Sequence, residues 1–97
     1  MNVRVQLYPP LNNAAGRNRV ELTLDAGATL QVLIDKLVER FGIKVHRCLF
    51  DDRGRIITAW CVFINKRPPV HFNRPEAMRT PLADSDEVSI LLALAGG

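Results

Sequence analysis

The segment from Leu30 to Phe41 constrains the fold more than any other part of the sequence. Its apolar residues recur at spacings of three and four, and its charged residues fall between them. This spacing predicts an amphipathic helix of about three turns whose apolar stripe faces a core. Thr29 is predicted to be the N-cap and Gly42 the C-terminal cap. The predicted stripe consists of Leu30, Leu33, Ile34, Leu37, Val38 and Phe41.

Alternating apolar and polar residues predict strands around this helix. The predicted strands cover 2–8, 19–24, 56–65, 70–72 and 87–92. The stretch 56–65 is so apolar that we expect a central strand covered on both faces. The first two strands are expected to pair as an antiparallel hairpin.

The connecting segments carry mostly turn signals. Residues 11–18 are predicted to form a loop, since they are rich in Asn, Ala and Gly. Residues 43–50 are expected to form a short helical turn that carries Val45 and Leu49 inward. Turns are predicted at 51–54 and 83–86. The order of elements therefore predicts an α+β domain, with one main helix on a mixed four- to five-stranded sheet.

Composition argues against several classes of function. Cys48 and Cys61 form no CxxC pair and are expected to be reduced, buried thiols, as in a cytoplasmic protein. His46 and His71 have no partner at a catalytic spacing, so we expect a protein that is not an enzyme. The thirteen basic residues are scattered among ten acidic ones, which argues against nucleic-acid binding. No run of eighteen apolar residues occurs, so we expect no membrane span.

The last predicted strand leads directly into Ala93-Leu94-Ala95 and then into Gly96-Gly97. We expect a domain over 1–92 and a flexible tail over 93–97. Glycines fit a channel too narrow for side chains. The terminal carboxylate is ionised near neutral pH and can attack the α-phosphate of ATP. A frayed end without function is the alternative.

Three stretches carry a resemblance to a known family. They are "TPLADSDEVSILLALAGG" (80–97), "VFINKRPPV" (62–70) and "LDAGATLQVLIDKL" (24–37). They resemble the ubiquitin-like sulfur carriers, which include the small subunit of molybdopterin synthase and the thiamine-biosynthesis sulfur carrier. The resemblance implies the β-grasp fold, in which the first and last strands lie parallel in the centre of the sheet.

The family resemblance also implies a mechanism. Gly97 would be adenylated by a ubiquitin-activating-like adenylyltransferase that uses ATP and Mg²⁺, and then converted to a thiocarboxylate. Gly96 would thread the partner's active site. The chain itself would bind no cofactor and no metal. The residues implied in docking the activating enzyme, or the sulfur-accepting synthase or large subunit, are Leu7, Leu91, Leu94 and Ala95.

Several functions stay open within this resemblance. The expected role is sulfur donation in cofactor or metabolite biosynthesis, with the molybdenum or tungsten cofactor favoured. Alternatives are the molybdopterin synthase small subunit proper, a carrier for an acceptor such as cysteine, and a modifier conjugated to lysine through Gly97. A plain interaction module is a further alternative. The tail lacks the prolines often found in the molybdopterin-synthase type.

Overall fold

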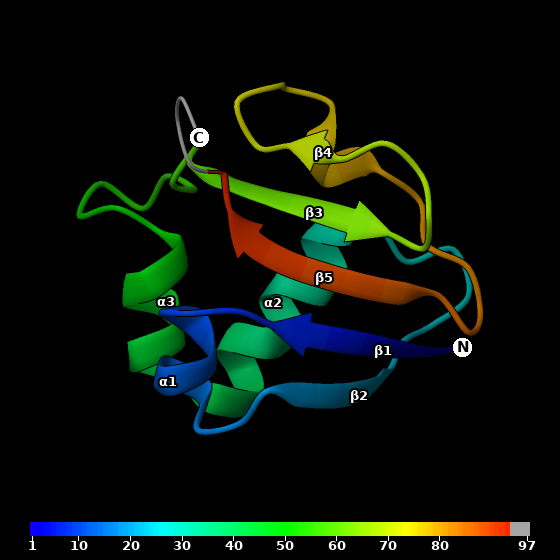
Figure 1. Cartoon of the computed structure of the whole chain (residues 1–97), viewed down its shortest axis with the longest axis horizontal. Coiled ribbons are helices and arrows are strands. Elements are labelled where there is room, and N and C mark those ends of the chain that lie inside the picture. Colours follow the sequence, from blue (N-terminus) through cyan, green and yellow to red (C-terminus); the bar gives the residue numbers. More distant parts are fainter. Residues whose placement is uncertain (94–97) are drawn as a thin grey trace.

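Five strands form one mixed sheet in the order β2-β1-β5-β3-β4. They are seen in a computed structural model that describes residues 1–93. The strands are β1 (Asn2–Leu7), β2 (Arg19–Thr23), β3 (Trp60–Ile64), β4 (Val70–His71) and β5 (Glu87–Leu92). The helices are α1 (Leu11–Ala15), α2 (Leu30–Phe41), α3 (Ile43–Leu49) and the 3₁₀ turn η1 (Ala77–Arg79). Figure 1 shows α2 crossing behind the sheet, with α1 and α3 at one end.

The first and last strands lie side by side in the sheet. β1 pairs in parallel with β5, with Val5 opposite Val88, and antiparallel with β2, with Val5 opposite Val20. β5 also pairs antiparallel with β3. This topology confirms the predicted hairpin, the α+β class and the β-grasp strand arrangement.

The long helix buries the predicted stripe against the sheet. Leu30, Leu33, Ile34 and Leu37 are fully buried, and Val38 and Phe41 are half-buried at the margin of the core. Burial of each large apolar side chain contributes about 1.5–3 kcal/mol. Helix α2 is therefore held mainly by packing, as its sequence pattern predicts.

The two predicted caps of α2 are occupied in different ways. Thr29 is at the N-cap position, but its side chain makes no capping hydrogen bond, and its carbonyl accepts from the Leu33 amide at 3.1 Å. Gly42 has a φ of 83°, and its amide donates to the Val38 carbonyl at 2.8 Å. This positive φ favours glycine and lets α3 begin at the next residue.

The predicted loop over 11–18 contains a short helix, so that expectation was wrong. Helix α1 covers Leu11–Ala15 and buries Leu11 completely. Gly16 ends it with a φ of 76° and a bond from its amide to the Asn12 carbonyl. A helix of five residues with one buried side chain produces no periodicity, and its Asn and Gly residues therefore suggested a loop.

The strand predicted over 56–65 was too long. Strand β3 covers only Trp60–Ile64. Ile56 and Ile57 are half-buried, and the Ile57 amide donates to the Leu49 carbonyl at the end of α3. Apolar composition predicted their burial, but they are buried outside the sheet. Phe63 is 37% exposed, so the outer face of β3 is only partly covered.

Two smaller expectations were confirmed. Helix α3 carries Val45 and Leu49 into the core. The turn that follows is closed by Asp51, whose Oδ1 accepts from the backbone amides of Arg53 and Arg55, both at 2.9 Å.

Candidate functional site

The last strand is paired with β1 up to Ile90 and with β3 up to the point where the predicted tail begins. The side chains of Val88 and Ile90, within this strand, are fully buried in the core, and Leu92 pairs with Trp60 of β3. The Ala93 amide donates to the Ala59 carbonyl at 2.7 Å. The position of the chain is therefore defined by backbone pairing as far as Ala93.

The start of β5 is fixed by a cluster of hydrogen bonds around Asp86, which is 4% exposed. Asp86 Oδ1 accepts from Asn65 Nδ2 at 2.8 Å, and Asp86 Oδ2 accepts from the Ala83 amide at 2.8 Å. Asn65 Oδ1 accepts in turn from the Glu87 amide at 2.9 Å. We call Asn65, Asp86 and the Glu87 amide the β5 clamp.

The clamp depends on backbone geometry that suits its residues. Asn65 has a φ of 56°, in the left-handed region that asparagine tolerates better than most residues. The Asn65 amide also donates to the Glu87 carbonyl at 2.8 Å. Together these bonds join the end of β3 to the start of β5. They help to set the register in which β5 pairs with β3.

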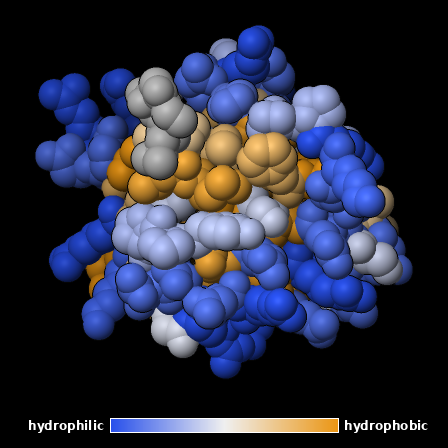
Figure 2. Space-filling view, viewed as in Figure 1, coloured by the Kyte–Doolittle hydropathy of each residue, from blue (hydrophilic) through white to orange (hydrophobic). Residues whose placement is uncertain are grey.

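The sheet face opposite the helices carries apolar and aromatic side chains around the end of β5. Cys61 lies opposite Leu91 across β3 and β5, and Phe63 lies opposite Ser89. Tyr8 is beside the end of β5, since its amide donates to the Ile90 carbonyl at 3.2 Å. Figure 2 shows apolar surface gathered over β3 and β5. We call Tyr8, Cys61, Phe63 and Leu91 the outer apolar face.

Aromatic side chains on this face are unusually open. Tyr8 is 41% exposed and Phe63 is 37% exposed. Exposed aromatic side chains are enriched where proteins dock, because each buries a large area with little loss of conformational entropy. The arrangement can therefore present the emerging chain to another protein beside an apolar surface.

The predicted site residues fall into three groups. Leu91 is half-buried on the outer apolar face. Leu7 is 4% exposed and faces the helices, because Val3, Val5 and Leu7 alternate toward the core. Leu7 therefore offers no docking surface in this structure, which corrects the expectation. The remaining predicted residues lie outside the described part of the chain, and their roles stay predictions: Leu94, Ala95, Gly96 and Gly97.

Sequence reasoning missed Tyr8 and Phe63 as candidate docking residues. A signal existed for Phe63, which alternates with Trp60, Val62 and Ile64 and must therefore face away from them. The uninterrupted apolarity of the strand suggested a second covering layer instead. Tyr8 directly precedes Pro9 and looked like the end of a strand.

The thiols and histidines form no reactive group in the described residues. Cys48 and Cys61 are free cysteines, and burial raises the pKa of both thiols. His46 stacks on Phe50 with ring centroids 4.9 Å apart. Within residues 1–93 no group of three or more His, Cys, Asp or Glu side chains could hold a metal ion. In the same range no helix has the length and apolarity needed to cross a membrane.

Comparison with solved structures identifies the fold. Small archaeal modifier protein 1 of Haloferax volcanii superposes with a TM-score of 0.79 at 22% identity, covering 96% of this chain and 98% of that one. CysO of Amycolatopsis orientalis, solved in complex with BexX, gives 0.70 at 23% identity, covering 98% and 99%. The chain has the ubiquitin-like β-grasp fold.

A further structural neighbour comes from Pyrococcus furiosus. A Pyrococcus furiosus protein provisionally assigned as subunit 1 of a molybdopterin converting factor gives a TM-score of 0.70 at 19% identity, covering 97% of this chain and 99% of that one. No family model and no curated protein sequence matches this chain. The predicted resemblance is thus confirmed at the level of the β-grasp fold.

Proposed function

We propose that this protein is a sulfur carrier whose Gly97 carboxylate is the reacting group. The observation that carries the proposal is the setting of β5, a central strand that is paired with β1 up to Ile90 and with β3 up to Leu92, and that ends beside the outer apolar face. Such a strand gives a partner enzyme a rigid handle for the residues that follow. The structural neighbours, which include a modifier and a CysO protein, support a carrier or modifier role.

The proposed chemistry belongs to partner enzymes. The Gly97 carboxylate attacks the α-phosphorus of ATP, with Mg²⁺ bound by the activating enzyme, and pyrophosphate leaves. A persulfide of a sulfur donor then attacks the acyl carbon and AMP leaves. A second thiol cleaves the resulting acyl disulfide, which yields the thiocarboxylate and a disulfide. This chain contributes the carboxylate and a docking surface, and no catalytic side chain.

The test is intact-mass analysis of the protein after incubation with its activating enzyme, ATP, Mg²⁺ and a persulfide donor. We expect one oxygen to be replaced by sulfur, and fragmentation to place the sulfur at Gly97. A variant lacking Gly97 should acquire no sulfur and keep the fluorescence of the buried Trp60. Sulfur transfer by that variant would contradict the proposal.

A protein modifier is the second candidate, favoured by the similarity to the archaeal modifier protein. In that role the activated carboxylate forms an amide with a lysine of a target protein. Conjugates that survive reducing agent and disappear when Gly97 is deleted would support this role. The molybdopterin synthase small subunit is supported by the Pyrococcus furiosus neighbour, and a complex with a synthase large subunit would assign it.

A further inference from the structure

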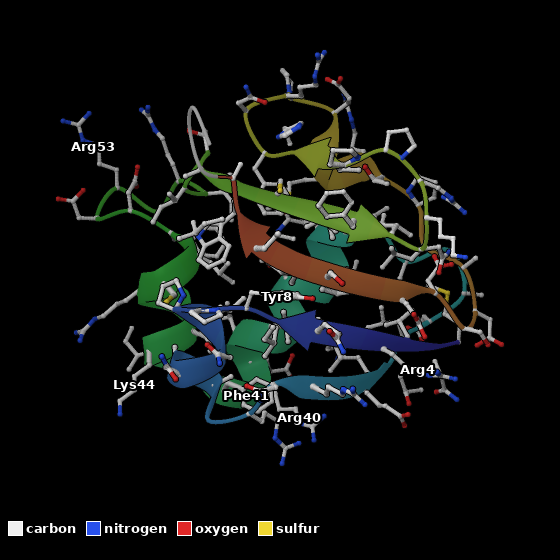
Figure 3. All side chains as sticks on the ribbon, in the orientation of Figure 1. Arg4, Tyr8, Arg40, Phe41, Lys44 and Arg53 are labelled. Atoms are coloured by element: carbon white, nitrogen blue, oxygen red, sulfur yellow. The ribbon has the colours of Figure 1, made fainter. Side chains whose placement is uncertain are left out.

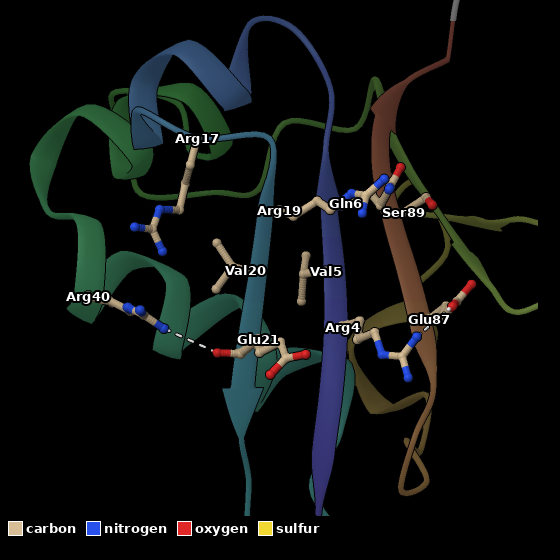
Figure 4. Close-up of a pocket in the computed structure, with 10 residues that line it drawn as sticks. All are labelled: Arg4, Val5, Gln6, Arg17, Arg19, Val20, Glu21, Arg40, Glu87 and Ser89. Atoms are coloured by element: carbon tan, nitrogen blue, oxygen red, sulfur yellow. Dashed lines mark hydrogen bonds and ion pairs between the residues drawn. The ribbon is translucent and has the colours of Figure 1, made fainter.

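A hollow of about 820 Å³ lies along β5, β1 and β2 and extends to the open edge of β2 (Figure 4). Its side chains come from β1, β2 and β5, from the connection between α1 and β2, and from the end of α2. Arginines dominate them. The lining side chains that carry the argument are Arg4, Arg17, Arg19, Glu21 and Arg40.

The edge of β2 has backbone groups that no strand satisfies. The Leu7 amide donates to the Asn18 carbonyl, and the Leu24 amide donates to the Met1 carbonyl. Because antiparallel pairing alternates, the backbone groups of the odd-numbered residues of β2 point away from β1. Arg19, Glu21 and Thr23 thus present their amides and carbonyls along an open edge.

Two guanidinium groups are held beside this edge by one aromatic ring. Arg17 Cζ lies 5.9 Å and Arg40 Cζ 5.4 Å from the centroid of Phe41. Within residues 1–93 neither of them nor Arg19 forms an ion pair with a carboxylate. Phe41 therefore gathers like charges that no acidic side chain of the described fold neutralises. Figure 3 shows Arg40 and Phe41 beside β2.

We propose that this edge binds an acidic, extended peptide segment of another protein as an added strand. The peptide backbone would pair with Arg19, Glu21 and Thr23, and its carboxylates would meet Arg17, Arg19 and Arg40. Arg40 Nη1 now donates to the Glu21 carbonyl at 3.1 Å. When the peptide binds, one of its amides donates to the Glu21 carbonyl in place of Arg40. The Arg40 guanidinium then donates to a carboxylate of the peptide, which makes a stronger hydrogen bond than a neutral carbonyl does.

A peptide suits the edge better than a nucleic acid does. A phosphodiester backbone has no donors for the carbonyls of Arg19 and Thr23. A peptide strand satisfies the carbonyls and places its own side chains alternately on the two faces. The hollow borders the outer apolar face, because Gln6 and Ser89 line the hollow while Tyr8 Oη donates to Gln6 Oε1 and Phe63 lies opposite Ser89.

The test is an NMR titration of the whole chain with a short acetylated and amidated peptide that alternates glutamate with valine. The largest amide shifts, and new protection from hydrogen exchange, are expected at Arg19, Glu21 and Thr23. A lysine-for-glutamate peptide, and one with proline at its centre, should bind at least about tenfold more weakly, because they lose charge pairing or backbone donors.

Charge-reversal variants separate this site from general attraction to a basic protein. The pair Arg17→Glu and Arg40→Glu should raise the Kd about tenfold or more. The control pair Arg53→Glu and Arg55→Glu makes the same change of charge in an exposed turn far from β2 (Figure 3), and should alter the Kd less than about threefold.

Four results would overturn the proposal. They are equal weakening by both pairs of variants, no binding of the acidic peptide, tighter binding of a single-stranded oligonucleotide to the same amides, and a homodimer joined through β2 that the peptide fails to displace. Each variant's fold is checked by the fluorescence of Trp60, which is 1% exposed.

Discussion

Replacement of Asn65 by alanine tests whether the β5 clamp holds the last strand. The variant loses the bond to the buried Asp86 carboxylate and the bond from the Glu87 amide. Because Asn65 is exposed, water replaces part of these contacts, so the lower end of each usual range of hydrogen-bond energy applies. The loss is about 1.5 kcal/mol for the bond to the charged carboxylate and about 0.5 kcal/mol for the bond from the neutral amide. An alanine at a φ of 56° adds about 1 kcal/mol.

The expected loss in the free energy of unfolding is therefore about 3 kcal/mol, equivalent to a fall in Tm on the order of 10–20 °C. Urea denaturation followed by fluorescence measures it directly, since Trp60 is the single tryptophan and is buried. The matched control is Asn73→Ala, an exposed loop asparagine that forms no side-chain hydrogen bond in the described residues. It should change stability by less than about 0.5 kcal/mol.

A double-mutant cycle sharpens the test. If Asn65 acts through Asp86, the loss in the variant carrying both Asn65→Ala and Asp86→Ala should be smaller than the sum of the single losses by about 1 kcal/mol or more. A loss below 1 kcal/mol for Asn65→Ala, or strict additivity in the cycle, would refute the role of the clamp.

Three further predictions concern the outer face, the thiols and the core. Phe63→Asp should weaken binding of the activating enzyme at least about tenfold. The control Val32→Asp, at the same 37% exposure but on α2, should leave that binding unchanged. Equal effects of the two variants in a binding assay would exclude the outer apolar face as the docking surface for the activating enzyme. Burial raises the pKa of the Cys48 and Cys61 thiols, so the unfolded chain loses their protons first as pH rises. Stability should therefore fall as the pH rises above the ordinary thiol pKa of about 8.5. A variant with serine at both positions should lose less stability in urea titrations between about pH 7.5 and about pH 9.5, which lie about one unit either side of that pKa. An identical decline in the variant would contradict a contribution from the buried thiols. Ile34→Ala, at a fully buried position, should cost about 2–5 kcal/mol in the same titration, and a cost below 1 kcal/mol would show that α2 is not packed as described.

Local pattern was a reliable guide where one face of an element is buried. The stripe of α2 and the alternation in β1, β2 and β5 follow from burial of every third or fourth, or every second, side chain. The pattern failed where a residue is buried without belonging to a paired strand or to a long helix. Ile56 is half-buried against the core without joining the sheet, and Leu11 anchors a helix too short to show a period.

Most of the elements, their order and a diglycine three residues after the last strand could be predicted from the sequence. The sequence also carried the resemblance that implied which strands lie in the centre. The tertiary structure was needed to show which strands lie side by side, because pairing joins segments that are far apart in the chain, whereas alternation within a strand sets only the face that each side chain takes. Strand order brought Tyr8 and Phe63 close to Leu91 and left the edge of β2 open beside Arg17 and Arg40. The inward position of Leu7 follows from the alternation of Val3, Val5 and Leu7 within β1.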